Sequence, residues 1–203
     1  RLGEAQQYVK DGRWRTWEPL GHLGRSLHGK TLGIFGMGRI GSAVAHRCSG
    51  GWSMKVVYCS RTPKDHMAPE GSRHVDFDTL LEASDFICVH APLTQDTFHQ
   101  FDFDAFKRMK TTAVFVNTGR GEIHDQKALS KALKRGLIFS AGLDVTSPEP
   151  IASDDSLLGL PNCIVLPHIG SATVESREAM ADIAADNLLL GLRGSPLRCP
   201  VTV

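Results

Sequence analysis

One stretch of twelve residues, Lys30–Gly41 (KTLGIFGMGRIG), constrains the fold of this chain more than any other. It opens with an apolar run, Thr31–Phe35, that leads into three glycines spaced GxGxxG. An amphipathic segment, Ser42–Cys48, follows directly. The order predicts a strand, a tight glycine turn and a helix, which is the opening of a dinucleotide-binding unit. The glycine pattern alone is weak, and the flanking strand and helix make it specific.

The three glycines have separate expected roles. Gly36 makes the tight turn, Gly38 lets the backbone approach a pyrophosphate, and Gly41 packs the helix against the strand. The start of the helix then offers unpaired N–H groups and the positive end of its dipole to that pyrophosphate. Arg39 and Ile40, between the second and third glycines, are expected to contact the same cofactor.

A second phosphate-binding pattern overlaps the first. Gly24–Thr31 (GRSLHGKT) fits GxxxxGK[ST] letter for letter. That loop must leave a strand and enter a helix, so that helix N–H groups surround the phosphates. Here Leu20–Leu23 does not read as a strand, and Lys30 and Thr31 begin one. We interpret the match as accidental.

The end of the second predicted strand, Lys55–Tyr58, indicates which dinucleotide binds. An NAD site carries Asp or Glu about 20 residues after the glycines, bound to the ribose 2′-hydroxyl. This chain has Ser60 and Arg61 there, followed by Thr62 and Lys64. A carboxylate would repel a 2′-phosphate, whereas Arg61 can bind one, with hydroxyl donors from Ser60 and Thr62. The sequence therefore favours NADP over NAD, and an ordinary surface arginine is the alternative interpretation.

Composition excludes several classes of function. The 203 residues carry 23 basic and 22 acidic side chains, interspersed, with a net charge of +1. That balance predicts neither a nucleic acid nor an anionic membrane as partner. No apolar run approaches the roughly 20 residues of a membrane span. The first residues resemble neither a signal peptide nor a Met start, so we interpret the chain as part of a longer protein.

Cysteine and histidine usage points to a reducing compartment and to no metal. The five cysteines include no CxxC pair, and four lie in or beside apolar runs, where free thiols are usually buried. An odd number of cysteines without the spacing of a disulfide framework favours the cytoplasm as the location of the protein. The nine histidines form no HxxxH or HExxH pattern, so no metal site is expected.

Apolar runs alternate with helical patterns along most of the chain. The predicted strands are nearly continuously apolar, which is typical of parallel strands buried on both faces: Thr31–Phe35, Lys55–Tyr58, Phe86–His90, Ala113–Asn117, Ile138–Asp144 and Cys163–Leu166. Helices are predicted at Leu2–Lys10, Asp76–Glu82, Asp102–Met109, Asp125–Arg135 and Val174–Leu192. The fold class is therefore α/β, a Rossmann-like, doubly wound parallel sheet with right-handed crossovers.

The predicted domain organisation has three parts. Residues 1–29 form a helix and an arm with two tryptophans, residues 30–173 form the nucleotide-binding domain, and residues 174–203 form a long helix and a tail.

Three predicted strands are followed by unusual polar residues. Arg120 follows the fourth strand, Glu149 the fifth and His168 the sixth. Each alone is more often a structural or solvated residue. Because ligands bind outside the carboxyl ends of parallel strands, the arrival of all three at one edge favours a joint functional role.

At this point the sequence resembles the D-isomer-specific 2-hydroxyacid dehydrogenase family. The blocks GMGRIG, NTGRGEIHD, AGLDVTSPEP and LPHIGSAT match its motifs in order, and the resemblance covers about Gly3 to Gly194. Within the family the chain is most similar to animal glyoxylate/hydroxypyruvate reductases. The resemblance implies NADPH-dependent reduction of glyoxylate to glycolate and of hydroxypyruvate to D-glycerate. Other NAD(P)-dependent members, such as phosphoglycerate dehydrogenases, and dinucleotide-sensing co-repressor modules remain alternatives.

The resemblance also implies roles for individual residues. His168 would donate the proton, Glu149 would hold its imidazole in the protonated form, and Arg120 would bind and polarise the keto acid. Ser171 would contact the substrate beside His168. The remaining cofactor contacts would come from Pro92, Thr118, Asp144 and Gly170.

The resemblance finally implies a missing part and a partner. In this family a substrate domain precedes and completes the nucleotide-binding domain, so this chain alone is expected to be inactive. Trp14 and Trp17 lie in a polar, Pro-ended segment and are expected to serve a homodimer, with packing onto their own domain as the alternative.

Overall fold

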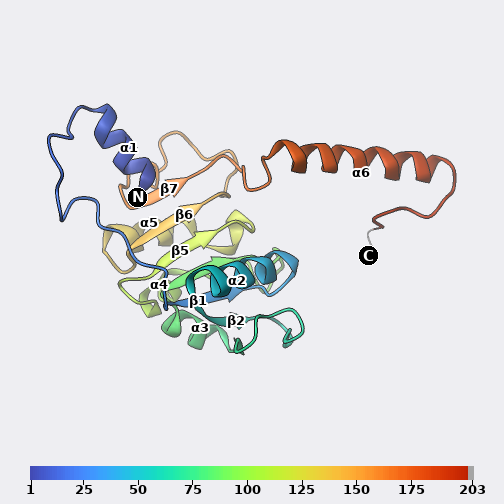
Figure 1. Cartoon of the computed structure of the whole chain (residues 1–203), viewed down its shortest axis with the longest axis horizontal. Coiled ribbons are helices and arrows are strands. Elements are labelled where there is room, and N and C mark those ends of the chain that lie inside the picture. Colours follow the sequence, from blue (N-terminus) through green and yellow to red (C-terminus); the bar gives the residue numbers. More distant parts are fainter. Residues whose placement is uncertain (201–203) are drawn as a thin grey trace. The chain divides into compact units, whose positions relative to one another are not determined.

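The structure is a computed structural model that describes residues 1–200, and the chain divides into two compact units, Arg1–Pro167 and His168–Val203 (Figure 1). The first unit holds every strand of the described residues and the second holds one long helix. The cleft described below lies wholly within the first unit.

The first unit contains a seven-stranded sheet in which all neighbouring strands are parallel. The strand order is β3-β2-β1-β4-β5-β6-β7. Chain order reverses between β1 and β4, and in such sheets ligands bind outside the carboxyl ends of the strands at that reversal. The strands are β1 (Thr31–Phe35), β2 (Lys55–Cys59), β3 (Arg73–His74), β4 (Phe86–Val89), β5 (Val114–Asn117), β6 (Ser140–Leu143) and β7 (Cys163–Val165).

Three helices of the first unit begin where an aspartate side chain binds their first N–H groups. Asp76, Asp102 and Asp125 each accept a hydrogen bond from a backbone N–H of the turn that follows. The helices are α1 (Leu2–Lys10), α2 (Arg39–Trp52), α3 (Phe77–Ala83), α4 (Phe103–Arg108) and α5 (Gln126–Lys134), with a 3-10 turn, η1 (Gly121–Ile123).

Two hydrophobic clusters lie on opposite faces of the sheet, because alternate residues of a strand point to opposite sides. Leu32 and Ile34 of β1 pack with Ala45 of α2. Phe35 of β1 belongs to the larger cluster, which also contains Leu80 of α3 and residues of α4 and α5. Helix α2 therefore covers one face of the sheet and α3–α5 cover the other (Figure 1).

The predicted fold class is confirmed, and α1, β1 and α6 (Val174–Leu192) have the predicted bounds. The overlapping phosphate-loop pattern does not form such a loop, because Thr31 begins a strand rather than a helix. One expectation is wrong: β4, β5 and β6 alternate between buried and half-buried residues instead of being buried on both faces. The fully buried positions are those on the side covered by α3–α5.

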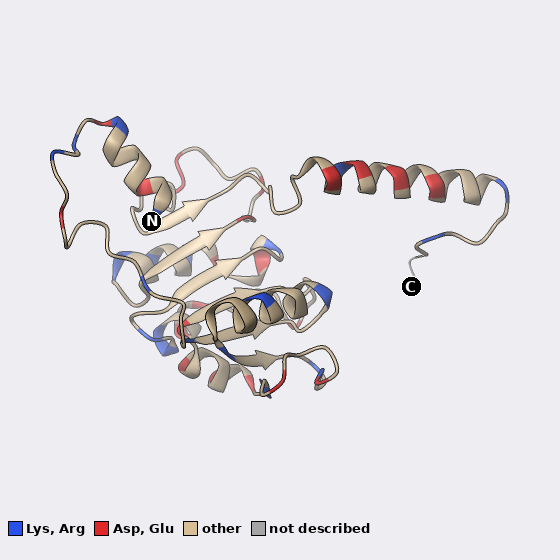
Figure 2. Ribbon diagram, in the orientation of Figure 1, with Lys and Arg blue, Asp and Glu red and all other residues tan. Residues whose placement is uncertain are grey.

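The second unit contains a short segment that begins at His168, then α6 and the residues after it. Thr173 caps the helix by accepting from the N–H of Ser176, and Arg198 pairs with Asp186 at 3.0 Å. The apolar side chains of Met180 and Leu188 on this helix are exposed. Acidic residues recur along this helix (Figure 2). Of the predicted part 174–203, residues 201–203 lie outside the described residues.

No helix within residues 1–200 is both long enough and apolar enough to cross a membrane.

Candidate dinucleotide-binding site

The glycine turn after β1 leaves room for a side chain at only one of its three glycines. Gly36 has a φ of +98°, and a Cβ there would collide with the backbone of Ala91. A Cβ on Gly41 would collide with the carbonyl of Gly36, so α2 packs directly against the turn. A Cβ on Gly38 would meet nothing within 4 Å. Gly38 therefore faces open space, where a ligand could approach the backbone.

The N-terminus of α2 is open as well. Its capping residue, Gly38, has no side chain to bind the first N–H groups, and Arg39 and Ile40 are exposed. The first helical turn is held from its other side, because the Ser42 hydroxyl donates to the carbonyl of Met67. Unpaired N–H groups at the start of a 14-residue helix suit an anionic group such as pyrophosphate.

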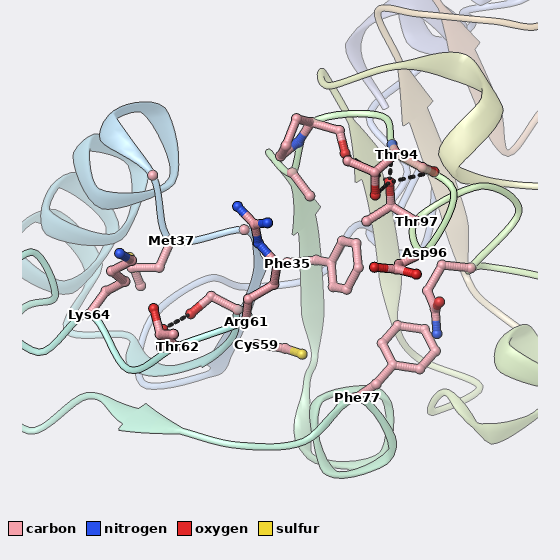
Figure 3. A pocket seen from close by; sticks show the side chains of 16 residues that line it. Phe35, Met37, Cys59, Arg61, Thr62, Lys64, Phe77, Thr94, Asp96 and Thr97 are labelled. Carbon is pink, nitrogen blue, oxygen red and sulfur yellow. Dashed lines mark hydrogen bonds between the residues drawn. The ribbon is translucent and has the colours of Figure 1, made fainter. Parts of the chain in front are cut away.

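A cleft of about 710 Å³ opens beside this turn (Figure 3). It contains six residues predicted to bind cofactor, which follow three different strands: Gly36, Gly38, Ser60, Arg61, Thr62 and Pro92. Ten further residues complete its wall: Phe35, Met37, Cys59, Lys64, Phe77, Ala91, Thr94, Asp96, Thr97 and Gln100.

Hydrogen bonds connect the residues of the loop after β2. The buried Tyr58 hydroxyl donates to the Asp65 carboxylate at 2.7 Å and accepts from the N–H of Lys64 at 2.9 Å. The Ser60 hydroxyl donates to the carbonyl of Thr62 at 2.7 Å. Neither Arg61 nor Lys64 forms a side-chain ion pair within residues 1–200, so both cations are available to a ligand.

The loop after β4 supplies the opposite wall of the cleft. The Thr97 hydroxyl donates to the carbonyl of Pro92 at 2.8 Å and accepts from the N–H of Thr94 at 2.8 Å. In Figure 3 the cations Arg61 and Lys64 lie on one side of the Phe35 ring and Asp96 lies on the other. The cleft therefore has a basic side next to the glycine turn and an acidic residue across from it.

Other predicted residues follow β5 and β6 and do not line this cleft. Thr118 places its hydroxyl 3.2 Å from Nδ1 of His90, and burial lowers the pKa of that histidine. Arg120 is exposed and donates to the carbonyl of Gly119 at 2.7 Å. Asp144 is buried at the end of β6, and Glu149 is exposed in the loop beyond it.

The last three predicted residues, His168, Gly170 and Ser171, belong to the second unit and are exposed. His168 has a φ of +54°, in the left-handed region that non-glycine residues adopt infrequently. Such backbone conformations are enriched at functional sites, although His22, Ser53 and His99 adopt them here too.

Sequence reasoning missed part of the cleft wall. Thr94, Asp96 and Thr97 were not predicted, although the segment APLTQDT directly follows a predicted strand at the carboxyl edge. Cys59 and Phe77 carry no such signal, because only the fold brings their side chains to the cleft. Within the described part of the chain, no group of three or more His, Cys, Asp or Glu residues could hold a metal ion.

The residues around the cleft fit a dinucleotide. The turn leaves an opening at Gly38, helix N–H groups face that opening, and two cations are available beside it.

Comparison with known proteins gives one family. Residues 1–170 match the model of the "D-isomer specific 2-hydroxyacid dehydrogenase, NAD binding domain". A glyoxylate reductase of Korarchaeum cryptofilum is 47% identical over 196 residues, which are 96% of this chain and 59% of that protein. A glyoxylate/hydroxypyruvate reductase B of Escherichia fergusonii is 46% identical over 198 residues, 96% of this chain and 60% of that protein.

Solved structures agree with the fold. A Thermus thermophilus protein has a TM-score of 0.93 at 44% identity, over 100% of this chain and 63% of that chain. An NADPH-dependent glyoxylate/hydroxypyruvate reductase of Sinorhizobium meliloti, in complex with citrate, has a TM-score of 0.87 at 36% identity, over 99% of this chain and 62% of that chain. The chain thus spans about three fifths of the length of these relatives.

Proposed function

The chain belongs to the D-isomer specific 2-hydroxyacid dehydrogenase family, as its NAD-binding domain, and from this premise we propose that the whole protein reduces a small 2-keto acid. The proposed substrates are glyoxylate, giving glycolate, and hydroxypyruvate, giving D-glycerate. The observation that carries the proposal is the cleft beside the glycine turn, in a chain whose relatives include proteins named for these reductions.

NADPH is the proposed cofactor. Its pyrophosphate would lie against Gly38 and the first N–H groups of α2. Its 2′-phosphate would lie at the basic side of the cleft, on Arg61 and Lys64, with hydroxyls of Ser60 and Thr62 nearby. The absence of a carboxylate at the end of β2 supports this placement, because NAD sites use one there.

Changing Arg61 to alanine is expected to weaken NADPH binding by about 1–3 kcal/mol, the contribution of a charge-assisted hydrogen bond, and to leave NADH binding nearly unchanged. Titration calorimetry with both cofactors on this chain measures the difference. Arg47→Ala is the matched control, because that arginine lies on α2 and does not line the cleft. An equal loss for NADPH and NADH would rule out recognition of the 2′-phosphate.

The chain's own residues would carry the remaining steps. When bound, the reduced cofactor supplies the hydride. Arg120 would bind the carboxylate of the keto acid and polarise its carbonyl oxygen, since a guanidinium offers two parallel donors. His168 would give its proton to that oxygen as the alkoxide forms, and Glu149 would orient the imidazole. Thr118, Asp144 and Gly170 would contact the nicotinamide half of the cofactor, and Ser171 the substrate.

The identity of the keto acid can be tested on the full-length protein. Steady-state rates with glyoxylate, hydroxypyruvate, pyruvate and phosphohydroxypyruvate would be compared at a fixed NADPH concentration. We expect the largest kcat/KM with hydroxypyruvate or glyoxylate. A preference for phosphohydroxypyruvate would instead indicate a phosphoglycerate dehydrogenase.

A homodimer is proposed through the segment that contains Trp14 and Trp17. The two side chains are 63% and 79% exposed, which supports an interface rather than packing of both rings onto their own domain. Exposed tryptophans are enriched as anchors of protein interfaces. We expect sedimentation of this chain to give a dimer, and Trp14→Ala/Trp17→Ala to weaken it. Trp52→Ala, a half-exposed tryptophan on α2, is the control. A monomeric wild type would remove the segment from the interface.

A further inference from the structure

A single buried amide closes the turn that carries Arg120. Asn117, the last residue of β5, is fully buried. Its side-chain oxygen accepts from the N–H of Gly119 at 2.9 Å, and its Nδ2 donates to the carbonyl of Arg120 at 2.9 Å. The amide therefore binds one donor and one acceptor of the same short turn. Only one of its two flipped orientations can do so, because the oxygen accepts and the nitrogen donates.

His124 lies against the same amide. Its Nδ1 is 3.0 Å from Nδ2 of Asn117, and the residue is fully buried after the turn η1. Because Nδ2 can only donate, Nδ1 must be the acceptor, and the neutral imidazole then carries its proton on Nε2. A flipped amide would turn its NH2 group toward the N–H of Gly119 and its oxygen toward the carbonyl of Arg120. The histidine thus adds a third contact to the orientation that the turn itself selects.

This histidine is costly to keep in the core. Its Nε2 is buried without a hydrogen-bond partner among the described residues, and burial lowers the pKa of the ring to about 4. The edge of the ring packs against Phe115 at a centroid distance of 5.8 Å. An apolar side chain of similar size would fill the space without an unpaired N–H group. Packing alone therefore does not explain a histidine here.

The surroundings leave the turn little freedom once Asn117 is oriented. A Cβ on Gly121 would collide with the backbone of Thr146, so the chain after Arg120 packs directly on the loop beyond β6. A Cβ on Gly119 would lie 3.2 Å from the carbonyl of Ala91, beyond β4. The turn after β5 is thus packed between the segment that follows β4 and the segment that follows β6. The position of the Arg120 backbone is defined by these contacts.

We propose that His124 is a positioning residue: its imidazole accepts a hydrogen bond from the oriented Asn117 amide and holds it in place, and that amide fixes the backbone from which Arg120 reaches the keto acid. The inference rests on the proposed function for the role of Arg120. The geometry of the turn itself does not depend on that role.

The test replaces His124 with phenylalanine in the full-length protein. His124→Phe keeps a planar ring, removes the acceptor for Asn117 and removes the unpaired N–H. We expect kcat/KM for hydroxypyruvate to fall about 10–100-fold, because small misplacements of a substrate-binding group are that costly. The melting temperature should stay equal or rise, and the dissociation constant for NADPH should not change. Asn117→Ala should lower kcat/KM in the same direction.

A matched control separates positioning from general damage to the core. Ser84 is also fully buried and donates to the carbonyl of Leu80, but it precedes β4, at the opposite end of the sheet from the turn. Ser84→Ala should lower the melting temperature and leave kcat/KM unchanged. A loss of kcat/KM in His124→Phe that merely follows a fall in melting temperature would overturn the proposal.

A readout without substrate distinguishes the two proposals. Nitrogen NMR of the wild type should find His124 with an unprotonated Nδ1, and hydrogen exchange at Gly119 should be slow and should accelerate in His124→Phe and Asn117→Ala. If exchange accelerates but the wild type reduces no keto acid, the proposed function fails and the account of the turn stands. A protonated Nδ1, or unchanged exchange and kinetics in His124→Phe, would overturn the inference.

Discussion

Changing His168 to alanine in the full-length protein is expected to lower kcat for keto-acid reduction by about 10²–10⁴-fold, the usual contribution of a positioned general acid. Without the imidazole, the developing alkoxide must take its proton from water. NADPH affinity should be unchanged, because the residues proposed to bind that cofactor most directly lie in the first unit. Stopped-flow measurement of NADPH oxidation, together with a binding titration, separates the two effects.

The proposed partnership with Glu149 gives this experiment its control. If Glu149 acts through His168, then Glu149→Gln should lower kcat less than His168→Ala, and the double variant should be no worse than His168→Ala alone. Additive losses would mean that the two residues act separately. A His168→Ala variant with wild-type kcat would show that the proton comes from another group.

The glycine-turn element of the fold was predictable because each of its signals is local. A strand of five residues, Thr31–Phe35, is apolar at every position except the first and the glycine, and the turn that follows needs glycine at Gly36 for its positive φ. The capping aspartates Asp76, Asp102 and Asp125 likewise mark three helix starts in the sequence itself. Local rules of this kind depend on a few neighbouring residues, so they can be applied without knowing the rest of the fold.

Elements without a local signal were missed. Strand β3 consists of Arg73 and His74, both exposed, and it exists only because the edge of β2 offers backbone hydrogen bonds. The alternating burial of β4–β6 depends on which helices cover each face of the sheet, which an apolar run does not encode. Strand length and continuous hydrophobicity alone cannot distinguish a strand covered on one face from one covered on both.

The candidate site likewise contains residues that local sequence signals predicted and contacts that they did not. Gly36, Gly38 and Arg61 were predicted from spacing, and the cleft brings them together. The contact between Asn117 and His124 was not predicted, because three residues of irregular backbone and the three-residue turn η1 separate them. In the sequence, His124 is one letter of the block NTGRGEIHD, and its burial and its partner become visible only in three dimensions.

Two alanine substitutions in the glycine turn are expected to have opposite consequences. Gly36→Ala should destabilise the first unit by about 3 kcal/mol or more, since the φ of +98° is strained for alanine and the new Cβ would collide with the backbone of Ala91. That loss is a large fraction of the roughly 5–15 kcal/mol that stabilises a typical domain. Thermal and urea unfolding of this chain measure it.

Gly38→Ala should leave that stability within about 0.5 kcal/mol of wild type, because its φ of −90° suits alanine and no atom lies within 4 Å of the new Cβ. It should instead weaken NADPH binding about tenfold or more, since the methyl group would stand where the backbone is proposed to approach the pyrophosphate. The pair separates folding from binding within one turn: a destabilised Gly38→Ala would place that glycine in the packing of the turn, and one that binds NADPH normally would move the pyrophosphate elsewhere. Gly36→Ala with an unchanged melting temperature would mean that the turn can relax around a side chain, and its role in fixing the cleft would have to be abandoned.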